Sequence, residues 1–125
     1  MRVFLVHVRD PQFFAIPRRT RAPNGRLQVM GFPPIGIMSL SSVLKRAGHE
    51  VVMFDQANPD TPNDVIVDQM RRQAPDLVGM SFLSTTSYPY AKILARQLRA
   101  ADAGVKLAFG GVFATLNSLW LKGLC

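Results

Sequence analysis

The sequence predicts an α/β fold built on a doubly wound parallel sheet. Short apolar segments alternate with segments of helical period along the chain. The apolar segments are hydrophobic throughout, which is typical of parallel strands covered by helices on both faces. Connections between such strands are right-handed crossovers, so we expect strand order 2-1-3-4.

Composition limits the class of protein further. A chain of 125 residues with 48% hydrophobic residues suits one domain, and no apolar run approaches the length of a membrane span. One cysteine, Cys125, excludes an internal disulfide and a cysteine-rich metal site. We therefore expect a cytoplasmic protein with no membrane partner.

The net charge of +7 raises the question of nucleic acid binding. No aromatic residues interleave with basic ones in a strand, and no helix gathers Arg and Lys on one side. Five basic residues fall in a Pro-rich loop over residues 9–34: Arg9, Arg18, Arg19, Arg21 and Arg26. A nucleic acid partner is therefore disfavoured, and the role of this loop stays open.

The first half of the chain predicts two strands and two helices. Residues 2–8 and 50–54 are apolar strands. Residues 35–47 form a helix that Gly48 closes, with an apolar face of Leu40, Val43, Leu44 and Ala47. The next helix begins at Thr61-Pro62-Asn63-Asp64, and its apolar face is Val65, Ile66, Met70 and Ala74.

The second half repeats the alternation. Residues 77–82 are the third strand and residues 105–109 the fourth. Ser87 caps the helix between them, whose inner face is expected to carry Tyr90, Leu94, Leu98 and Ala101. A last helix begins over residues 115–121. The whole is a flavodoxin-like or Rossmann-like arrangement.

Polar and glycine-rich segments follow the third and fourth strands. Ser81 to Ser87 is rich in hydroxyls, and Gly110-Gly111 follows the fourth strand. Ligands bind such sheets at the carboxyl ends of the strands. The chain contains neither a Gly-x-Gly-x-x-Gly turn nor a P-loop, and no carboxylate ends the third strand. Dinucleotide binding, P-loop chemistry and phosphoacceptor function are therefore disfavoured.

The spacing of these two segments resembles a known family. Ser81-x-Leu83, the 26 residues from 84 to 109, and then Gly110-Gly111 are similar to the cobalamin-binding domains of methionine synthase and the methylmalonyl mutases. The resemblance implies a slot for the detached nucleotide tail of cobalamin, in which hydroxyls bond the tail and glycines admit it. The histidine motif of that family, Asp-x-His-x-x-Gly, is absent.

Further segments resemble the amino-terminal domain of cobalamin-dependent radical S-adenosylmethionine enzymes. These are Pro33-Pro34-Ile35-Gly36, Ala47-Gly48-His49, Pro75-Asp76-Leu77-Val78-Gly79 and Gly110-Gly111-Val112-Phe113-Ala114-Thr115. The resemblance implies cobalamin binding in a base-off, His-off form, most often for methyl transfer and in some members for oxidative cyclisation or ring contraction. It implies these cofactor-binding residues: Pro33, Pro34, Ile35, Gly36, Ser81, Leu83, Ser84, Thr85, Thr86, Gly110, Gly111, Val112, Phe113, Ala114 and Thr115.

The resemblance also defines what to expect outside this domain. The chain has no cysteine triplet for an iron-sulfur cluster, so we expect that cluster and S-adenosylmethionine only in a following domain. We interpret residues 1–125 as a cobalamin-binding domain, the leading part of a longer enzyme and not catalytic alone. A non-enzymatic cobalamin sensor or carrier is the alternative.

We expect no protein ligand to the cobalt. His7 ends the first strand, and we interpret it as a strand-end histidine bonded to neighbouring backbone instead of a cobalt ligand. The resemblance also implies a fifth strand, which is missing from this chain, so we expect the fourth strand to be an edge prone to self-association.

Overall fold

Four strands form one parallel sheet in the computed structural model, which describes residues 1–10, 34–57, 60–82 and 84–118. The strands are β1 (Arg2–His7), β2 (Glu50–Asp55), β3 (Leu77–Ser81) and β4 (Lys106–Gly110). Their order is β2-β1-β3-β4, so the predicted topology is confirmed. Most of the loop predicted over residues 9–34 lies outside the described residues.

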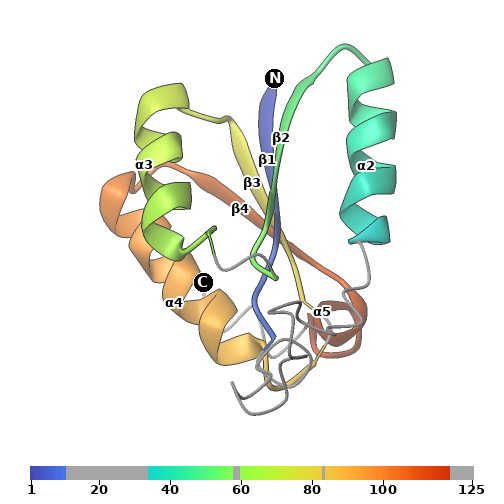
Figure 1. Cartoon of the computed structure of the whole chain (residues 1–125), viewed down its shortest axis with the longest axis vertical. Coiled ribbons are helices and arrows are strands. Elements are labelled where there is room, and N and C mark those ends of the chain that lie inside the picture. The colour runs from blue at the N-terminus through green and yellow to red at the C-terminus, as the bar shows by residue number, and fades with distance from the viewer. Residues whose placement is uncertain (11–33, 58–59, 83, 119–125) are drawn as a thin grey trace, which may run out of the picture.

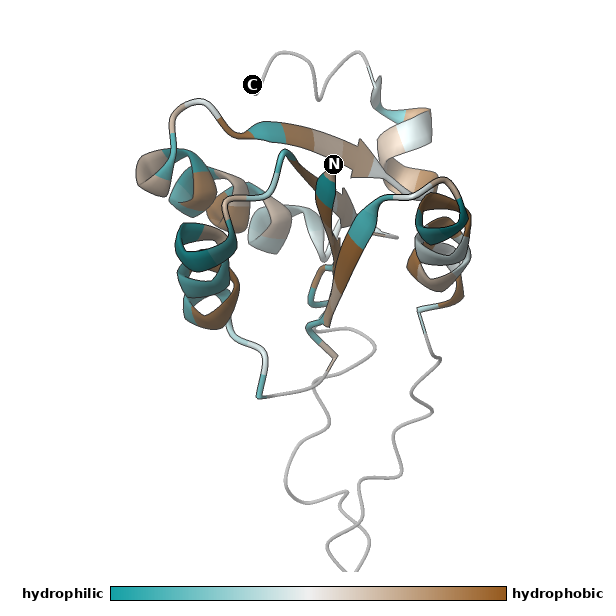
Figure 2. Cartoon of the chain, turned by 90° about the horizontal axis from the view of Figure 1, so that it is seen from above, coloured by the Kyte–Doolittle hydropathy of each residue, from teal (hydrophilic) through white to brown (hydrophobic). Residues whose placement is uncertain are grey.

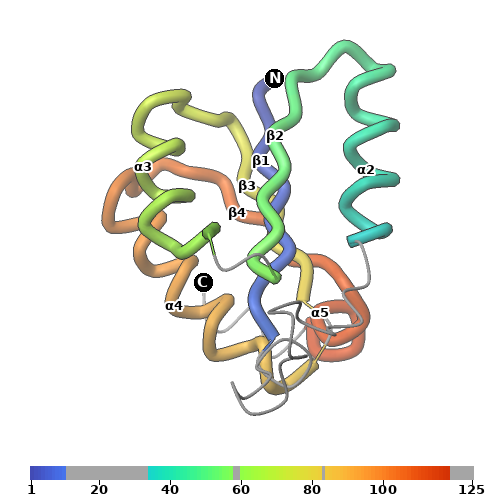
Figure 3. The backbone as a smooth tube through the Cα atoms, viewed as in Figure 1, coloured from blue at the N-terminus to red at the C-terminus, as the bar shows by residue number. Residues whose placement is uncertain are grey.

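Helices cover both faces of the sheet. They are α2 (Ile35–Arg46), α3 (Asn63–Gln73), α4 (Tyr88–Ala101) and the short α5 (Val112–Leu116). The helices α3 and α4 lie together on one side, α2 lies on the other, and α5 lies by the carboxyl ends of the strands (Figure 1). The tube through the Cα atoms shows the same division (Figure 3). The fold is therefore doubly wound, as expected.

The larger core lies under α3 and α4. It joins Phe4 and Val6 of β1 to Val78 and Met80 of β3, and it is closed by Ile66, Met70, Ala91, Leu94 and Leu98 from the two helices. Strands in the middle of the molecule are mostly hydrophobic, while the helices carry hydrophilic patches (Figure 2). The predicted inner positions Ile66, Met70, Leu94 and Leu98 are confirmed.

The buried face of α2 agrees with the predicted one only at Leu44, which is partly buried against the core on the α2 side of the sheet. The buried residues of α2 are Ile37 and Ser41, and Ile37 packs with Val3 and Leu5 of β1. Leu40 and Val43 are 54% and 61% exposed, so their prediction as inner residues was wrong. Because apolar residues occur nearly all round this helix, periodicity alone did not select the buried side.

Four other predicted inner residues are exposed, among them Ala47 and Ala74 at the ends of α2 and α3. Tyr90 is one position away from the buried Ala91, and its ring lies 5.9 Å from the Arg9 guanidinium carbon. Val65 is 39% exposed beside the buried Ile66. The other long side chains predicted on the faces of α3 and α4 are buried, so Val65 and Tyr90 lie at the edges of correctly predicted faces.

Helix ends follow local chemistry with two differences. Gly48, beyond the end of α2, has φ +90°, as a closing glycine requires. Ser87 occupies the N-cap position of α4, as predicted, but its side chain makes no capping hydrogen bond to that helix. The last described helix begins at Val112 and not at Thr115, because Gly111 at φ +100° already turns the chain out of β4. Residues 119–121 of the predicted helix lie outside the described residues.

The exposed edge of β4 leads to a prediction about self-association. Within the described part of the chain, β4 pairs with β3 alone. Unpaired backbone donors and acceptors on such an edge are a template for a second chain. We expect sedimentation velocity to show dimers or larger species that increase with protein concentration. A single monomeric species over the whole accessible concentration range would contradict this expectation.

Candidate functional site

One row of the sheet brings four polar or small residues to its carboxyl edge. The strand register aligns Asp55 of β2, His7 of β1, Ser81 of β3 and Gly110 of β4. Side chains alternate along a strand, and Leu5 packs on the α2 side. His7 therefore faces the α2 side, and its partners in the row face the same way.

The side chains in this row are only partly exposed. His7 is 9% exposed, while Asp55 and Ser81 are half-buried. The Asp55 Oδ1 accepts a hydrogen bond from the backbone N–H of Ala57 at 3.0 Å. No partner for the Ser81 Oγ is present among the described residues. Ser81 is therefore a hydroxyl that a ligand on this side of the sheet can use.

The two glycines after β4 have different surroundings. A Cβ on Gly110 would meet no atom within 4 Å, whereas a Cβ on Gly111 would lie 2.5 Å from the carbonyl oxygen of Phe82. Gly111 also has φ +100°, which side chains rarely tolerate. The fold itself therefore requires Gly111, and the interpretation that a glycine leaves room for a ligand is supported at Gly110.

A buried carboxylate collects the hydroxyls of the loop after β3. Asp10 is 3% exposed. Its Oδ2 accepts a hydrogen bond from the Ser84 Oγ at 2.6 Å, and its Oδ1 accepts one from the Thr86 Oγ1 at 2.7 Å. The two hydroxyl oxygens lie 2.7 Å apart. Our reading of the sequence missed Asp10, although it follows β1 at the edge where the hydroxyl loop was expected.

The remaining hydroxyls of that loop differ in their use. The buried Ser87 Oγ accepts from the Ser84 backbone N–H at 3.3 Å and donates to the Ser84 carbonyl oxygen at 2.9 Å. Thr85 is exposed and has no hydrogen-bond partner for its side chain among the described residues. The predicted row of hydroxyls is thus divided between internal bonds at Ser84, Thr86 and Ser87 and available groups at Ser81 and Thr85.

A buried glutamine, also missed, ties the ends of two strands to α3. The Gln56 Nε2 donates to the Asn63 Oδ1 at 2.8 Å and to the Thr61 carbonyl oxygen at 3.3 Å. The Gln56 Oε1 accepts from the Arg9 N–H at 3.3 Å, and the Gln56 N–H donates to the His7 carbonyl oxygen at 3.0 Å. These bonds fix the chain from the His7 carbonyl to the Arg9 N–H, immediately before Asp10.

The segment after Gly111 divides between core and surface. Phe113 and Ala114 are buried, and the Phe113 ring lies 5.5 Å from that of Phe82 and 5.7 Å from that of Tyr88. Val112 is 60% exposed, and the Thr115 Oγ1 donates to the Gly111 carbonyl oxygen at 2.9 Å. Phe113 and Ala114 therefore support the site through packing, while Val112 offers surface to it.

The Pro-Pro segment is described only from its second proline. Pro34 precedes α2, Ile35 is 66% exposed, and a Cβ on Gly36 would meet no atom within 4 Å. Pro33 and Leu83, both predicted to bind cofactor, lie outside the described residues. The start of α2 therefore offers open, apolar surface on the side that Ser81 and Gly110 face.

Two features are absent from the described residues. In the part of the chain that the structure describes, no three His, Cys, Asp or Glu side chains gather closely enough to hold a metal ion. No helix within that same part is long and apolar enough to cross a membrane. What the described residues present to a ligand at this edge is a set of polar groups, a glycine and apolar surface.

Comparison with known proteins gives the family. The sequence model of the B12 binding domain matches residues 30–124. The chain belongs to the B12-binding domain family. The match includes β3, the hydroxyl loop, β4 and the glycine pair, and it confirms the resemblance to cobalamin-binding domains.

One curated relative is an enzyme of a longer chain. This B12-binding domain is 30% identical over 98 residues to the anaerobic magnesium-protoporphyrin IX monomethyl ester cyclase of Synechocystis sp.. The similar region is 77% of this chain and 19% of the cyclase, so the chain spans about a fifth of that relative's length.

Proposed function

We propose that this domain binds cobalamin with the nucleotide tail detached from cobalt, and that the tail lies on the α2 side beside β3 and β4. The open space at Gly110, next to Ser81 in the strand register, carries this proposal. A flat ring can approach the backbone there because no Cβ intervenes, and the Ser81 hydroxyl can bond a ring nitrogen or ribose.

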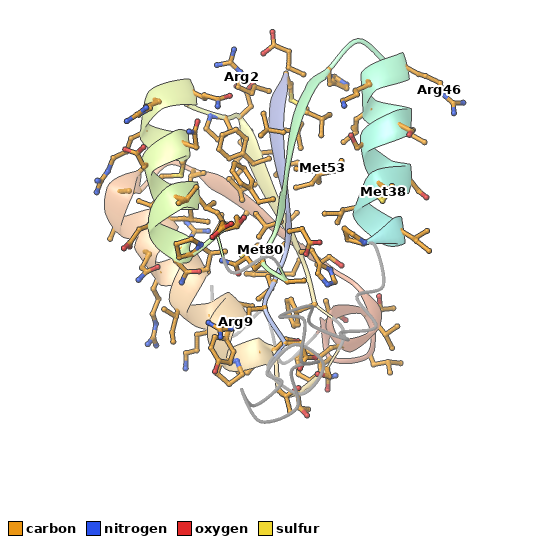
Figure 4. The ribbon with its side chains drawn as sticks, in the orientation of Figure 1. Arg2, Arg9, Met38, Arg46, Met53 and Met80 are labelled. Carbon is orange, nitrogen blue, oxygen red and sulfur yellow. The ribbon has the colours of Figure 1, made fainter. Side chains whose placement is uncertain are left out.

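The corrin ring needs apolar surface on the same side of the sheet. Ile35 and Met38 of α2 are 66% and 45% exposed, and Met53 of β2 is 43% exposed. Met53 points to the side on which α2 and Met38 lie (Figure 4). Cofactor sites are mostly apolar with a few placed polar groups, and these side chains on the same side of the sheet as Ser81 fit that description.

The lower face of cobalt is proposed to lack a histidine. The motif that supplies such a ligand is absent, and the start of α2 offers Ile35, Gly36 and Met38 instead. Methionine sulfur is a weak ligand here compared with imidazole nitrogen. His7 faces the α2 side and is the described histidine that can compete for this position.

The enzyme context is also part of the proposal. We expect a radical S-adenosylmethionine domain in cis to use the bound cobalt, and that domain would hold the iron-sulfur cluster and S-adenosylmethionine. Bound cobalamin supplies a cobalt that carries a methyl group, while this chain positions and encloses it. Methyl transfer is the typical outcome; the relative's printed activity is a cyclisation, which the resemblance also implied. A cytoplasmic location suits this chemistry.

Retention of cobalamin by the purified chain tests the proposal. Hydroxocobalamin is added, the excess is removed by gel filtration, and the absorption spectrum of the protein fraction is recorded. We expect corrin absorption to elute with the protein. A colourless protein fraction that retains its circular dichroism spectrum would contradict cobalamin binding by this chain.

Replacement of Ser81 by alanine is expected to weaken cobalamin binding about fivefold. The substitution removes one hydrogen bond worth about 1 kcal/mol and leaves the strand intact. Titration monitored by absorption gives the Kd. Ser42→Ala, at an exposed position of α2, is the matched control and is expected to bind as the wild type does. Equal Kd values for the Ser81 and Ser42 variants would remove Ser81 from the site.

A further inference from the structure

The cluster of Asp10, Ser84 and Thr86 has three close oxygen contacts and too few protons to fill them. Ser84 and Thr86 donate to the two carboxylate oxygens at 2.6 and 2.7 Å, and the hydroxyls themselves lie 2.7 Å apart. Each hydroxyl carries one proton, and a carboxylate only accepts. Hydrogen bonds to a charged acceptor are the stronger ones, so Asp10 takes both protons.

The consequence is a pair of hydroxyl oxygens that can only accept. With both protons directed at Asp10, the lone pairs of Ser84 and Thr86 face each other across the 2.7 Å contact. Thr86 is exposed and Ser84 is half-buried, so a donor from outside can reach this pair. A group that brings an N–H satisfies both oxygens, whereas a group that only accepts does not.

We infer that this cluster is a binding site for a primary amide of the bound corrinoid, and that Asp10 is the positioning residue that makes the two hydroxyls acceptors. The inference rests on the proposed function and deepens it. The edge of the corrin ring carries amide side chains, and the family match includes both hydroxyls. Ser81 and Gly110 serve the nucleotide tail in the proposal, whereas this cluster serves the ring edge.

Asp10→Asn gives a sharp test of the proton count. The side-chain amide of asparagine both donates and accepts. It can donate to one hydroxyl, which donates to the second hydroxyl, which returns a proton to the amide oxygen. The ring of three hydrogen bonds is then complete without a ligand. The substitution should preserve the loop, and the Ser84 and Thr86 oxygens should no longer need a hydrogen-bond donor from a ligand.

The experiment compares two corrinoids that both lack the nucleotide tail. Dicyanocobinamide carries amide side chains, and the dicyano form of cobyrinic acid heptamethyl ester carries esters that only accept. The Kd of each is measured by absorption titration of the whole 125-residue chain. We expect the ester-to-amide ratio of Kd values to fall about fivefold in Asp10→Asn, the value of one hydrogen bond.

Two more variants distinguish a change in the ester-to-amide ratio from a general loss of structure or binding. Asp68→Asn removes an exposed carboxylate that pairs with Arg72, and it should keep the wild-type ratio. Thr86→Val removes one acceptor and should lower the ratio as Asp10→Asn does. The ligand-free Asp10→Asn protein should keep the circular dichroism spectrum of the wild type. A purely structural role for Asp10 would instead weaken both corrinoids alike and leave the ester-to-amide ratio unchanged.

Each outcome decides between the two proposals. Retention of both corrinoids with the same ratio in the wild type and Asp10→Asn would overturn the amide site and leave cobalamin binding in place. Binding of neither corrinoid, nor of hydroxocobalamin, would overturn the proposed function and this inference with it. A lost amide preference in Asp10→Asn and Thr86→Val, with the circular dichroism spectrum retained, supports the site.

Discussion

Replacement of Gly110 by leucine is expected to lower cobalamin retention by roughly a hundredfold while the fold survives. A Cβ at this position meets no atom within 4 Å, so the new side chain has room in the free protein. That same room is where the nucleotide tail is proposed to lie, beside Ser81. A leucine there fills the space in advance.

The result is read from two measurements on the same variant. Titration with hydroxocobalamin gives the Kd, and thermal unfolding by circular dichroism gives the Tm. We expect a strongly raised Kd with a Tm within about 3 °C of the wild type, since surface substitutions free of clashes change stability little. An unchanged Kd would place the tail elsewhere in the molecule.

Replacement of Gly111 by leucine is expected to destabilise the fold itself. The Cβ would lie 2.5 Å from the Phe82 carbonyl oxygen, which is backbone and has little freedom to move. The left-handed φ of +100° adds strain for any residue with a side chain. We expect a loss of roughly 3 kcal/mol in the free energy of unfolding, or a fall in Tm of about 10 °C.

The adjacent glycines therefore act as controls for each other. Gly110→Leu should lose the ligand and keep the fold, and Gly111→Leu should lose stability before any ligand is added. Denaturant unfolding of both variants without cobalamin gives the comparison. A Gly111→Leu protein as stable as Gly110→Leu would show that the turn between β4 and α5 differs from the one described here.

The sheet could be predicted from the sequence because each strand is an uninterrupted apolar run. The segments ending at His7 and at Ser81 were placed within a residue or two of their observed bounds. Strand order followed from the preference for right-handed crossovers and was confirmed. These features depend on short-range pattern and chirality, which the sequence carries directly.

The buried face of α2 could not be predicted from the same kind of pattern. Its apolar residues occur nearly all round the helix, and packing against β1 selects Ile37 with the small Ser41. Leu40 and Val43 stay exposed. Which face is buried depends on how the helix sits on the sheet, and that is a property of the tertiary structure.

Two residues of the candidate site lie together as the sequence suggested, while the buried Asp10 carboxylate was not predicted. Ser81 and Gly110 do lie side by side in the strand register. Asp10 is separated from Ser84 by 74 residues and from Thr86 by 76, and no local sequence pattern indicates these contacts. The general rule that carboxyl ends of parallel strands meet would have brought Asp10 into consideration.

Electron paramagnetic resonance of the reduced cob(II)alamin complex tests the central claim most directly. A nitrogen ligand on the lower face of cobalt, from the nucleotide tail or from a histidine, splits the cobalt lines into triplets. We predict a spectrum without this nitrogen splitting in the wild-type chain, because the tail is detached and no histidine replaces it. Nitrogen splitting in the wild type would contradict the account, and its loss in His7→Ala would identify His7 as the ligand.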